Sequence, residues 1–260
     1  MAEQFAIVTG ASSGIGYQLA RCAAERGHDL LVVADEPLIE GAAEDFRGRG
    51  VAVRAVQADL ATLDGVDTLL AAAEGRPIDI MCANAGVGVG GAFLHQDISA
   101  WRHVVDTNIT GTLYLLQRVL RQMVERGRGR VLVTGSIAGY VPGPFNAVYN
   151  GTKAFLDNFT AALRNEFKDA DGVTLTTLMP GATDTEFFAR AGMEDTEVGT
   201  AKKADPADVA RQGWDAMMEG ESHIVTGMMN KLRVAAAGVA PDSVMAEQHR
   251  NMAEPGSGEH

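Results

Sequence analysis

Tyr149 and Lys153 stand four residues apart in the stretch YNGTK, and Ser136 precedes the tyrosine by 13 residues. In a helix, residues four apart are neighbours on one face. A tyrosine phenol has a pKa of about 10, so it exchanges protons at neutral pH only where a nearby cation favours its ionised form. Lys153 would be such a cation, although a Tyr-x-x-x-Lys pair alone is more often just one face of a helix. The three residues form a candidate proton-transfer site.

A second candidate site is the glycine-rich turn TGASSGIG at residues 9–16. Gly10, Gly14 and Gly16 directly follow the apolar run Phe5–Val8 and open a helical pattern. Glycines at such a junction permit a tight turn, let the backbone approach a pyrophosphate and allow close packing of helix on strand. No Gly-Lys-Ser/Thr follows, so the turn is not a nucleoside-triphosphate P-loop. It predicts a dinucleotide site.

Acidic residues follow the next two apolar runs. Asp35 comes 19 residues after Gly16, close to the spacing of about 20 at which a carboxylate binds the ribose hydroxyls of adenosine. Asp59 follows the third run, where a carboxylate could accept a hydrogen bond from the adenine amino group. Each has a simpler interpretation as a solvated turn residue.

To meet in one site, these residues must lie on loops that the strands and helices bring close together. Short apolar runs predict strands at Phe5–Val8, Leu30–Ala34, Val51–Gln57, Ile78–Cys82, Arg130–Thr134, Val173–Met179 and His223–Thr226. Helical patterns lie between them at Gly14–Arg26, Leu38–Arg49, Asp64–Glu74, Trp101–Arg126 and Ala147–Lys168. Continuous apolar strands that alternate with helices are typical of parallel sheets buried on both faces. We therefore expect an α/β fold: a Rossmann-like, doubly wound parallel sheet of about seven strands with helices on both faces.

The 260 residues show no shift in composition that would mark a second domain. We expect a single dinucleotide-binding domain over residues 1–250, with a lid at about 184–204 and a mobile tail at 251–260. Before that tail, Met228, Leu232, Ala235 and Ala236 recur at near-helical spacing, and Pro241 opens another helical pattern. These helices either cover the end of the sheet or flank the lid and shape the mouth of a substrate site.

Charge and composition exclude several classes of protein. The chain has 34 acidic and 22 basic residues, a net charge of −12, and so lacks the basic surface that nucleic acid or an anionic membrane requires. No apolar run approaches the roughly 20 residues of a membrane span. Four arginines form a local basic run, which we interpret as a solvated helix end and loop: Arg121, Arg126, Arg128 and Arg130.

The remaining reactive residue types add no site. Cys22 and Cys82 lie in a helical and a strand-like pattern and are expected to be buried, reduced thiols. The six histidines lack metal-ligand spacing, so we assign no metal. The N-terminus has neither a basic region nor an apolar segment typical of a signal peptide, and we expect a cytoplasmic protein.

Several motifs in order resemble those of the short-chain dehydrogenase/reductase family, in its form of about 250 residues. The matching stretches are TGASSGIG at 9–16, ADL at 58–60, NAG at 84–86, NITG with Asn108, Ser136, YNGTK at 149–153 and PGATDT at 180–185. The resemblance covers roughly Ala6 to Thr226. It departs at Ala83, where the family often has an asparagine, a change that affects one hydrogen bond at the sheet edge.

The resemblance implies a catalytic tetrad. Tyr149 would be the general acid in reduction and the base in oxidation, and Lys153 would lower the Tyr149 pKa and hold the nicotinamide ribose. Ser136 would donate a hydrogen bond to the substrate oxygen. Asn108 would fix a kinked helix backbone and a water that relays protons to Lys153.

The resemblance and the glycine turn together give a set of ligand residues. The expected cofactor-binding residues are Gly10, Ser12, Ser13, Gly14, Ile15, Gly16, Asp35, Asp59, Leu60, Asn84, Ala85, Gly86, Tyr149, Lys153, Pro180, Gly181, Thr183 and Thr185. The expected substrate pocket is apolar, although such residues are as often core: Val87, Gly139, Phe145, Phe187 and Met193.

The sequence favours an NAD(H)-dependent enzyme that interconverts a secondary alcohol and a ketone. Asp35 would repel the 2′-phosphate of NADP, and no Arg or Lys follows it closely. The alternatives are an NADPH-dependent 3-oxoacyl or carbonyl reductase and, less favoured, an inactive cofactor-sensing or scaffold protein or a sugar-nucleotide epimerase. Because the C-terminal pattern departs from the commonest family ending, we expect a homodimer, with a homotetramer as the alternative.

Overall fold

The computed structural model describes residues 4–170 and 172–259. Seven parallel strands form one sheet in the order β3-β2-β1-β4-β5-β6-β7. The strands are β1 (Phe5–Thr9), β2 (Asp29–Ala34), β3 (Val53–Gln57), β4 (Ile80–Ala83), β5 (Gly129–Thr134), β6 (Val173–Met179) and β7 (His223–Val225). Each predicted strand is present, with its ends within two residues of the prediction. The doubly wound α/β fold is confirmed.

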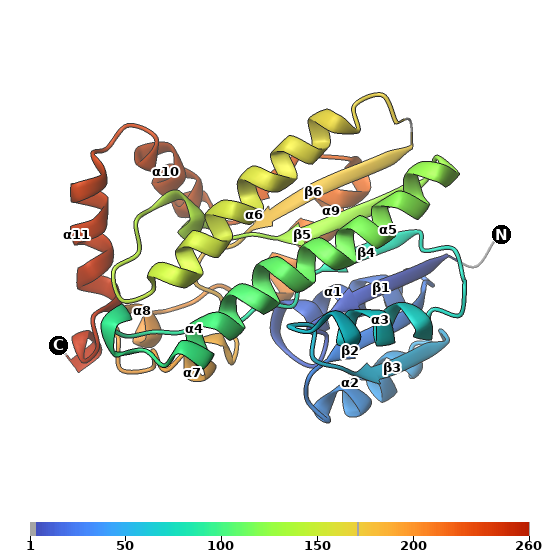
Figure 1. Ribbon diagram of the computed structural model, residues 1–260, viewed down its shortest axis with the longest axis horizontal. Coiled ribbons are helices and arrows are strands. Elements are labelled where there is room, and N and C mark those ends of the chain that lie inside the picture. Colours follow the sequence, from blue (N-terminus) through green and yellow to red (C-terminus); the bar gives the residue numbers. More distant parts are fainter. Residues whose placement is uncertain (1–3, 171, 260) are drawn as a thin grey trace.

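Helices cover both faces of this sheet, as Figure 1 shows. The principal helices are α1 (Gly14–Glu25), α2 (Leu38–Arg47), α3 (Leu63–Ala72), α4 (Ile98–Val105), α5 (Thr112–Arg126), α6 (Ala147–Glu166) and α9 (Pro206–Glu219). Short elements are η1 (Phe93–His95), η2 (Asp106–Gly111), η3 (Ile137–Tyr140), α7 (Phe187–Arg190) and α8 (Glu197–Thr200), and the chain ends with α10 (Met228–Ala237), α11 (Asp242–Ala253) and η4 (Ser257–Glu259).

Alternate residues of the strands face two separate apolar layers. Ala6 and Val8 of β1 pack with α1, α2 and α9 on one face, where Trp214 is fully buried. Phe5 and Ile7 face the opposite layer, formed with α3 and α5. Because successive side chains of a strand point to opposite faces, a continuous apolar run supplies both layers at once. This explains why the strands were readable in the sequence.

The helix predicted at 101–126 is not a regular α-helix. It consists of α4, a π-helical segment at Asp106–Gly111 and α5. A π segment widens the helix locally and is common at functional sites. Helix α9 was missing from the prediction, although Asp205 caps it, Pro206 opens it and Gly220 ends it in the left-handed conformation.

The C-terminal region forms two helices and a final turn at the end of the molecule opposite the N-terminus (Figure 1). A mobile tail was expected from residue 251, whereas residues 251–253 complete α11. The backbone N–H groups of Gly256 and Gly258 donate to the side chain and the carbonyl of Asp195, both at 2.9 Å. Gly256 and Gly258 are therefore bonded to the 184–204 segment.

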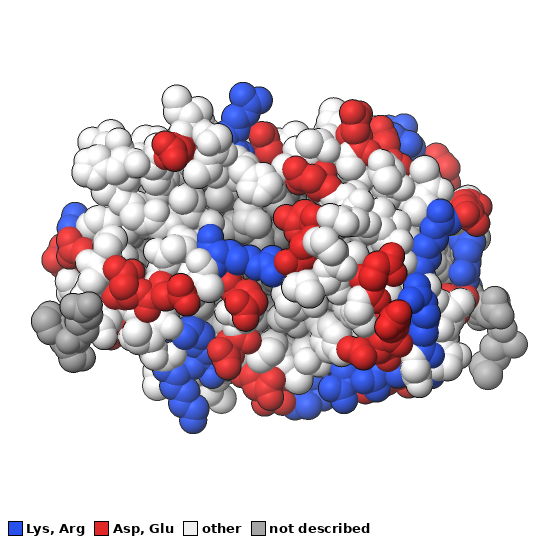
Figure 2. Space-filling view, turned by 90° about the horizontal axis from the view of Figure 1, so that it is seen from below, with Lys and Arg blue, Asp and Glu red and all other residues white. Residues whose placement is uncertain are grey.

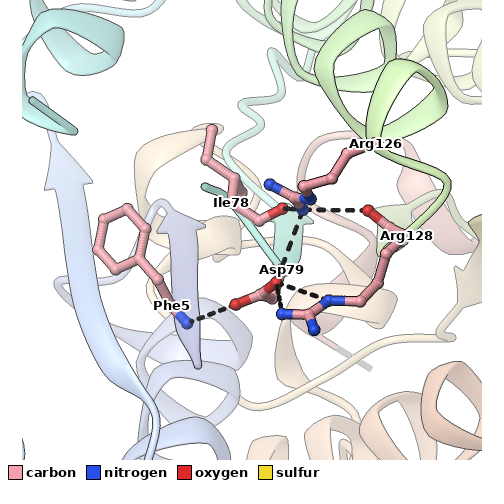
Figure 3. A network of polar contacts seen from close by, with 5 residues as sticks. All are labelled: Phe5, Ile78, Asp79, Arg126 and Arg128. Carbon is pink, nitrogen blue, oxygen red and sulfur yellow. Dashed lines mark hydrogen bonds and ion pairs between the residues drawn. The ribbon is translucent and has the colours of Figure 1, made fainter. Parts of the chain in front are cut away.

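Three arginines of the basic run, Arg126, Arg128 and Arg130, form hydrogen bonds, in contrast to the solvated helix end and loop expected from the sequence, whereas Arg121 is exposed as expected. Figure 3 shows Asp79 beside Arg126 and Arg128, just before β4. Its carboxylate accepts from both Nε (3.1 Å) and Nη2 (2.5 Å) of Arg128 and from the backbone N–H of Phe5 (3.1 Å), and Arg126 lies 3.6 Å away. Arg126 also donates to the carbonyl of Ile78. These hydrogen bonds join the loop before β5 to the neighbouring strands. Asp79, which accepts several of them, is nearly buried.

Charged side chains of both signs are mixed on the face seen in Figure 2, around a hollow with largely uncharged walls. The face shown has no continuous basic surface. Within residues 4–170 and 172–259, no helix combines the length and the apolar character needed to cross a membrane.

We predict that Asp79→Ala lowers the free energy of unfolding by roughly 1–3 kcal/mol, because it leaves a buried backbone N–H without its acceptor and removes the nearly buried carboxylate that Arg126 and Arg128 bind. Urea denaturation measures this change. Asp67→Ala is the control: Asp67 pairs with Arg118 on the surface at 3.3 Å, so its loss should cost less than about 1 kcal/mol. Equal costs for both variants would contradict the role of Asp79.

Candidate active site

A cavity of about 380 Å³ opens at the carboxyl edge of the sheet. The chain runs from β1 outward through β2 and β3, and then returns to place β4 on the other side of β1. The loops that follow β1 and β4 therefore diverge, and ligands of open α/β sheets bind in the crevice between such loops. Loops after β5 and β6 complete the wall.

The glycine turn between β1 and α1 has the shape of a phosphate cradle. Gly10 and Gly14 adopt φ values of +64° and +56°, which disfavour side chains. A Cβ at Gly16 would collide with the carbonyl oxygen of Gly10, so α1 can start this close to the turn only with glycine. A tight glycine-containing turn at the N-terminus of a helix fits the pyrophosphate of a dinucleotide.

Two threonines that the sequence analysis did not identify hold this turn against β4. The hydroxyl of Thr9 accepts from the backbone N–H groups of Asn84 (2.9 Å) and Ala85 (2.8 Å). Asn84 in turn donates to the carbonyl of Thr9 at 3.2 Å and accepts from Thr134 Oγ1 at 3.0 Å. Thr9 is the first residue of the glycine motif, and Thr134 comes two residues before Ser136. Both therefore lie next to residues that the sequence analysis did identify as site residues.

The side of the cavity next to the ends of β2 and β3 is acidic. Asp35 follows β2 and Asp59 follows β3, and both line the cavity. Next to them, Glu36 accepts from Ser12 Oγ at 2.6 Å and from Arg190 Nη2 at 2.8 Å. The Arg190–Glu36 pair joins α7 to the end of β2, and no local sequence signal connects residues so far apart in the chain.

Tyr149, Lys153 and Ser136 meet at the floor of the cavity. The ammonium of Lys153 lies 5.7 Å from the centre of the Tyr149 ring and donates to the carbonyl of Thr134 at 2.7 Å. Ser136 Oγ accepts from the backbone N–H of Ala138 at 3.1 Å, which fixes the hydroxyl at the start of η3. The ring of Phe187 covers Tyr149, with the ring centres 4.9 Å apart.

Burial controls the protonation of this group. It raises the pKa of Tyr149 to about 12, against the opposing effect of hydrogen bonding with Ser136. It lowers the pKa of Lys153 to about 8, although the negative charge of Asp157 raises it. Both shifts favour the uncharged forms. A tyrosine and a lysine in contact and both shifted are typical of proton-transfer sites.

Asn108 stands in the π segment and is fully buried. Its side chain accepts from the backbone N–H of Val87 and donates to the carbonyl of the same residue, each at 2.9 Å, and donates to Thr152 Oγ1 at 3.0 Å. It therefore connects the loop after β4 to α6. The π segment is what brings the amide into reach of both elements.

The structure gathers most of the expected site residues around this one cavity. Those that line it are Gly10, Ser12, Ser13, Gly14, Ile15, Asp35, Asp59, Leu60, Asn84, Ala85, Gly86, Val87, Ser136, Tyr149, Lys153, Pro180, Gly181, Thr183, Thr185, Phe187 and Met193. Gly16 and Asn108 lie behind the wall. Gly139 and Phe145 do not line the cavity. Gly139 packs against Asp157, and Phe145 packs in a cluster with Phe187, Phe188 and Met193.

The C-terminal helices build part of the cavity wall. The residues that line it are Arg233 and Val234 of α10 and Met245, Gln248, His249 and Met252 of α11, together with Phe187 and Met193. His249 contacts the carbonyl of Pro144 at 3.1 Å through Nδ1. Of the two positions considered for these helices, the structure supports the one beside the cavity: α10 packs on η3 and α11 on α8.

The sequence matches the model of a known family. The family described as short chain dehydrogenase matches residues 4–196. An uncharacterised oxidoreductase of Myxococcus xanthus is 36% identical over 194 residues, which are 73% of this chain and 76% of that protein. A cis-4-hydroxycyclohexanecarboxylate dehydrogenase of Sinomonas cyclohexanicum is 36% identical over 194 residues, 72% of this chain and 76% of that protein.

Solved structures agree with this match. A short-chain dehydrogenase from Sphingobium yanoikuyae in complex with NADPH is 29% identical and superposes with a TM-score of 0.82, covering 93% of this chain and 94% of that one. A short-chain dehydrogenase/reductase from Burkholderia phymatum in complex with NAD has a TM-score of 0.81 at 23% identity, over 90% of this chain and 92% of that one. The second likeness is one of fold alone.

We predict that Gly16→Ala destabilises the protein and weakens dinucleotide binding at least about tenfold, because the new methyl group must displace the turn. Thermal denaturation and a titration with NADH measure the two effects. Gly41→Ala is the control, because a Cβ at Gly41 in α2 meets no atom within 4 Å. It should leave binding unchanged and stabilise the helix by about 0.5–1 kcal/mol. Unaltered binding in Gly16→Ala would contradict the cradle.

Proposed function

Because this chain belongs to the short-chain dehydrogenase family, we propose that it is an NAD(H)-dependent oxidoreductase that interconverts a secondary alcohol and a ketone. The observation that carries the proposal is the meeting of Tyr149, Lys153 and Ser136 in one cavity with the glycine turn. A proton-transfer group beside a dinucleotide cradle supplies what hydride transfer at a carbinol carbon requires.

Residues on both sides of the β1–β4 crevice would hold the dinucleotide. The turn at Gly10–Gly16 would bind the pyrophosphate, Asp35 the adenosine ribose, and Lys153 the nicotinamide ribose. When bound, the nicotinamide would exchange a hydride with the substrate carbon. The position of each residue in the lining of the cavity supports this assignment.

Tyr149 would transfer the proton. In ketone reduction its phenol donates to the carbonyl oxygen, and in alcohol oxidation its phenolate accepts the hydroxyl proton. Ser136 would hold that oxygen by a hydrogen bond, and a protonated Lys153 beside Tyr149 would favour the phenolate. Because burial raises the pKa of Tyr149, the neutral phenol predominates at pH 7, and oxidation is expected to accelerate as the pH rises.

The acidic adenosine side favours NAD(H) over NADP(H). Asp35 and Glu36 are adjacent carboxylates beside the expected ribose site, and a 2′-phosphate placed there would be repelled. The alternative is an NADPH-dependent 3-oxoacyl or carbonyl reductase. It is kept because a 29% identical relative was solved with NADPH and because Arg190 lies next to Glu36.

The substrate we propose is a largely hydrophobic alcohol or ketone. Val87, Phe187, Met193 and Met245 present apolar surface to the cavity. A 36% identical relative is a dehydrogenase of cis-4-hydroxycyclohexanecarboxylate, a secondary alcohol on a ring. A panel of alicyclic and aryl alcohols and ketones, with this compound included, tests the proposed class.

We predict that Tyr149→Phe lowers kcat by a factor of at least about 10²–10⁴, because it removes the proton donor and acceptor. The Kd for NADH should stay within about threefold of the wild-type value, since the ring and its packing remain. Initial-rate assays with an alcohol from the panel that the wild type oxidises give kcat, and a fluorescence titration with NADH gives the Kd.

Tyr114→Phe is the matched control for this substitution. Tyr114 lies on α5, where its hydroxyl donates to Asp67 at 2.9 Å, away from the cavity. It should keep full turnover. If Tyr149→Phe retained more than about a tenth of the wild-type kcat, Tyr149 would not be the proton-transfer group.

We predict that the wild type has a higher kcat/KM with NAD(H) than with NADP(H), and that Asp35→Arg shifts this ratio toward NADP(H) by about tenfold or more. Kinetics with each dinucleotide at a fixed substrate concentration measure the ratio. Glu44→Arg makes the same change of charge on the exposed side of α2 and should leave the ratio unchanged. A wild-type preference for NADPH would favour the alternative reductase.

A further inference from the structure

A second ionisable group lies directly behind the proposed proton-transfer site. Asp157 is on α6 one turn beyond Lys153, so the two side chains share a helix face. Both of its carboxylate oxygens are shielded from solvent, and among the described residues only the backbone N–H of Ser136 approaches them as a hydrogen-bond donor. A carboxylate in this condition costs stability, so its presence calls for a physical reason.

The chain makes room for this carboxyl group with two glycines. A Cβ at Gly135 would collide with Oδ1 of Asp157, and a Cβ at Gly139 would lie 2.6 Å from Oδ2. These glycines stand on either side of Ser136, at the end of β5 and in η3. The carboxyl group therefore packs beneath the loop that carries the Ser136 hydroxyl.

Ionisable side chains face Asp157 from two of the elements packed around it. Lys153 and Arg164 come from α6, together with the more distant Tyr149, and Tyr140 comes from η3. The loop after β5 contributes the backbone N–H of Ser136, and β6 contributes the neutral hydroxyl of Thr177, to which Arg164 donates at 3.0 Å. The guanidinium of Arg164 thus has its own hydrogen-bond acceptor in Thr177.

These groups act on one another through charge. Burial raises the pKa of Asp157 to about 7, while Lys153 is the strongest of the influences that lower it. In the other direction, the charge of Asp157 raises the pKa of Lys153 and opposes the effect of burial. Each of the two groups therefore shifts the pKa of the other toward its charged form.

We propose that Asp157 is a positioning residue of the active site, whose buried carboxylate keeps Lys153 charged and supports the Ser136 loop from behind. The proposal rests on the proposed function, because it assigns Lys153 its role toward Tyr149 and the dinucleotide. Asp157 itself does not line the cavity, so it acts only through its neighbours.

If Asp157 served only to stabilise the fold, its substitution would change the stability of the protein in a different way. Because the pKa of Asp157 is raised in the folded protein, its ionisation is disfavoured by folding, and the stability it costs grows as the pH rises from about 4 to 7. Removing the carboxylate should therefore leave the protein as stable as the wild type, or more stable, at pH 8. A residue retained only for stability would give the opposite result.

The test compares Asp157→Asn with the wild type and with Glu166→Gln, which removes a negative charge from the exposed end of the same helix. The Kd for NADH and kcat/KM for alcohol oxidation are measured at pH 6.5 and 9. In Asp157→Asn, Lys153 loses its proton at a lower pH. We expect both quantities to stay within about twofold of wild type at pH 6.5 and to worsen about fivefold or more at pH 9.

Each outcome bears on the proposal. A profile for Asp157→Asn that parallels the wild type overturns it, and so does an equal loss at both pH values accompanied by a lower Tm. If Asp157→Asn does not fold, Asp157→Ala carries the same expectations. Failure of the wild type to bind either dinucleotide would refute the proposed function and this inference with it. Normal wild-type binding and turnover without a pH-dependent difference would refute the role of Asp157 alone.

Discussion

The burial of one lysine ammonium is the constraint on which the candidate site depends. Lys153 is only 4% exposed, and water no longer solvates its charge, so protein atoms must do so. The carbonyl of Thr134 accepts from it at 2.7 Å. A Cβ at Gly86 would lie 3.4 Å from its Nζ and 3.3 Å from Asn108 Oδ1, so the loop after β4 packs closely against both side chains. The Thr134 carbonyl and this loop thus enclose the buried ammonium.

The strand order explains why these groups can meet at all. Because β1 and β4 are neighbours in the sheet, with Val8 opposite Cys82, the turn after β1 and the loop after β4 begin side by side. Thr9 bonds one to the other through its hydroxyl. The π segment then turns Asn108 toward both that loop and α6. The sheet supplies the crevice, and a few side-chain hydrogen bonds determine how closely its walls approach.

Features set by local pattern could be predicted from the sequence, whereas those set by distant partners could not. The strands, the glycine turn and the Tyr149–Lys153 spacing depend on neighbouring residues, and each appears where the pattern indicated. The Arg128–Asp79 and Arg190–Glu36 pairs join residues 49 and 154 positions apart, so no spacing rule identifies them. Helix α9 is a different case, because its cap, proline and terminal glycine were present and were overlooked.

The C-terminal helices and the proposed catalytic helix are mechanically connected. Phe145, just before α6, has a φ of +61°, a strained value for a bulky residue. The guanidinium of Arg250 lies 5.0 Å above its ring, and the neighbouring His249 contacts the Pro144 carbonyl. His249 also lies 3.4 Å from Asn150, the residue after Tyr149. Helix α11 therefore contacts the residues just before the start of α6 and the residue after Tyr149. A helix nearly one hundred residues later in the chain thus borders the segment that carries the Tyr149 phenol.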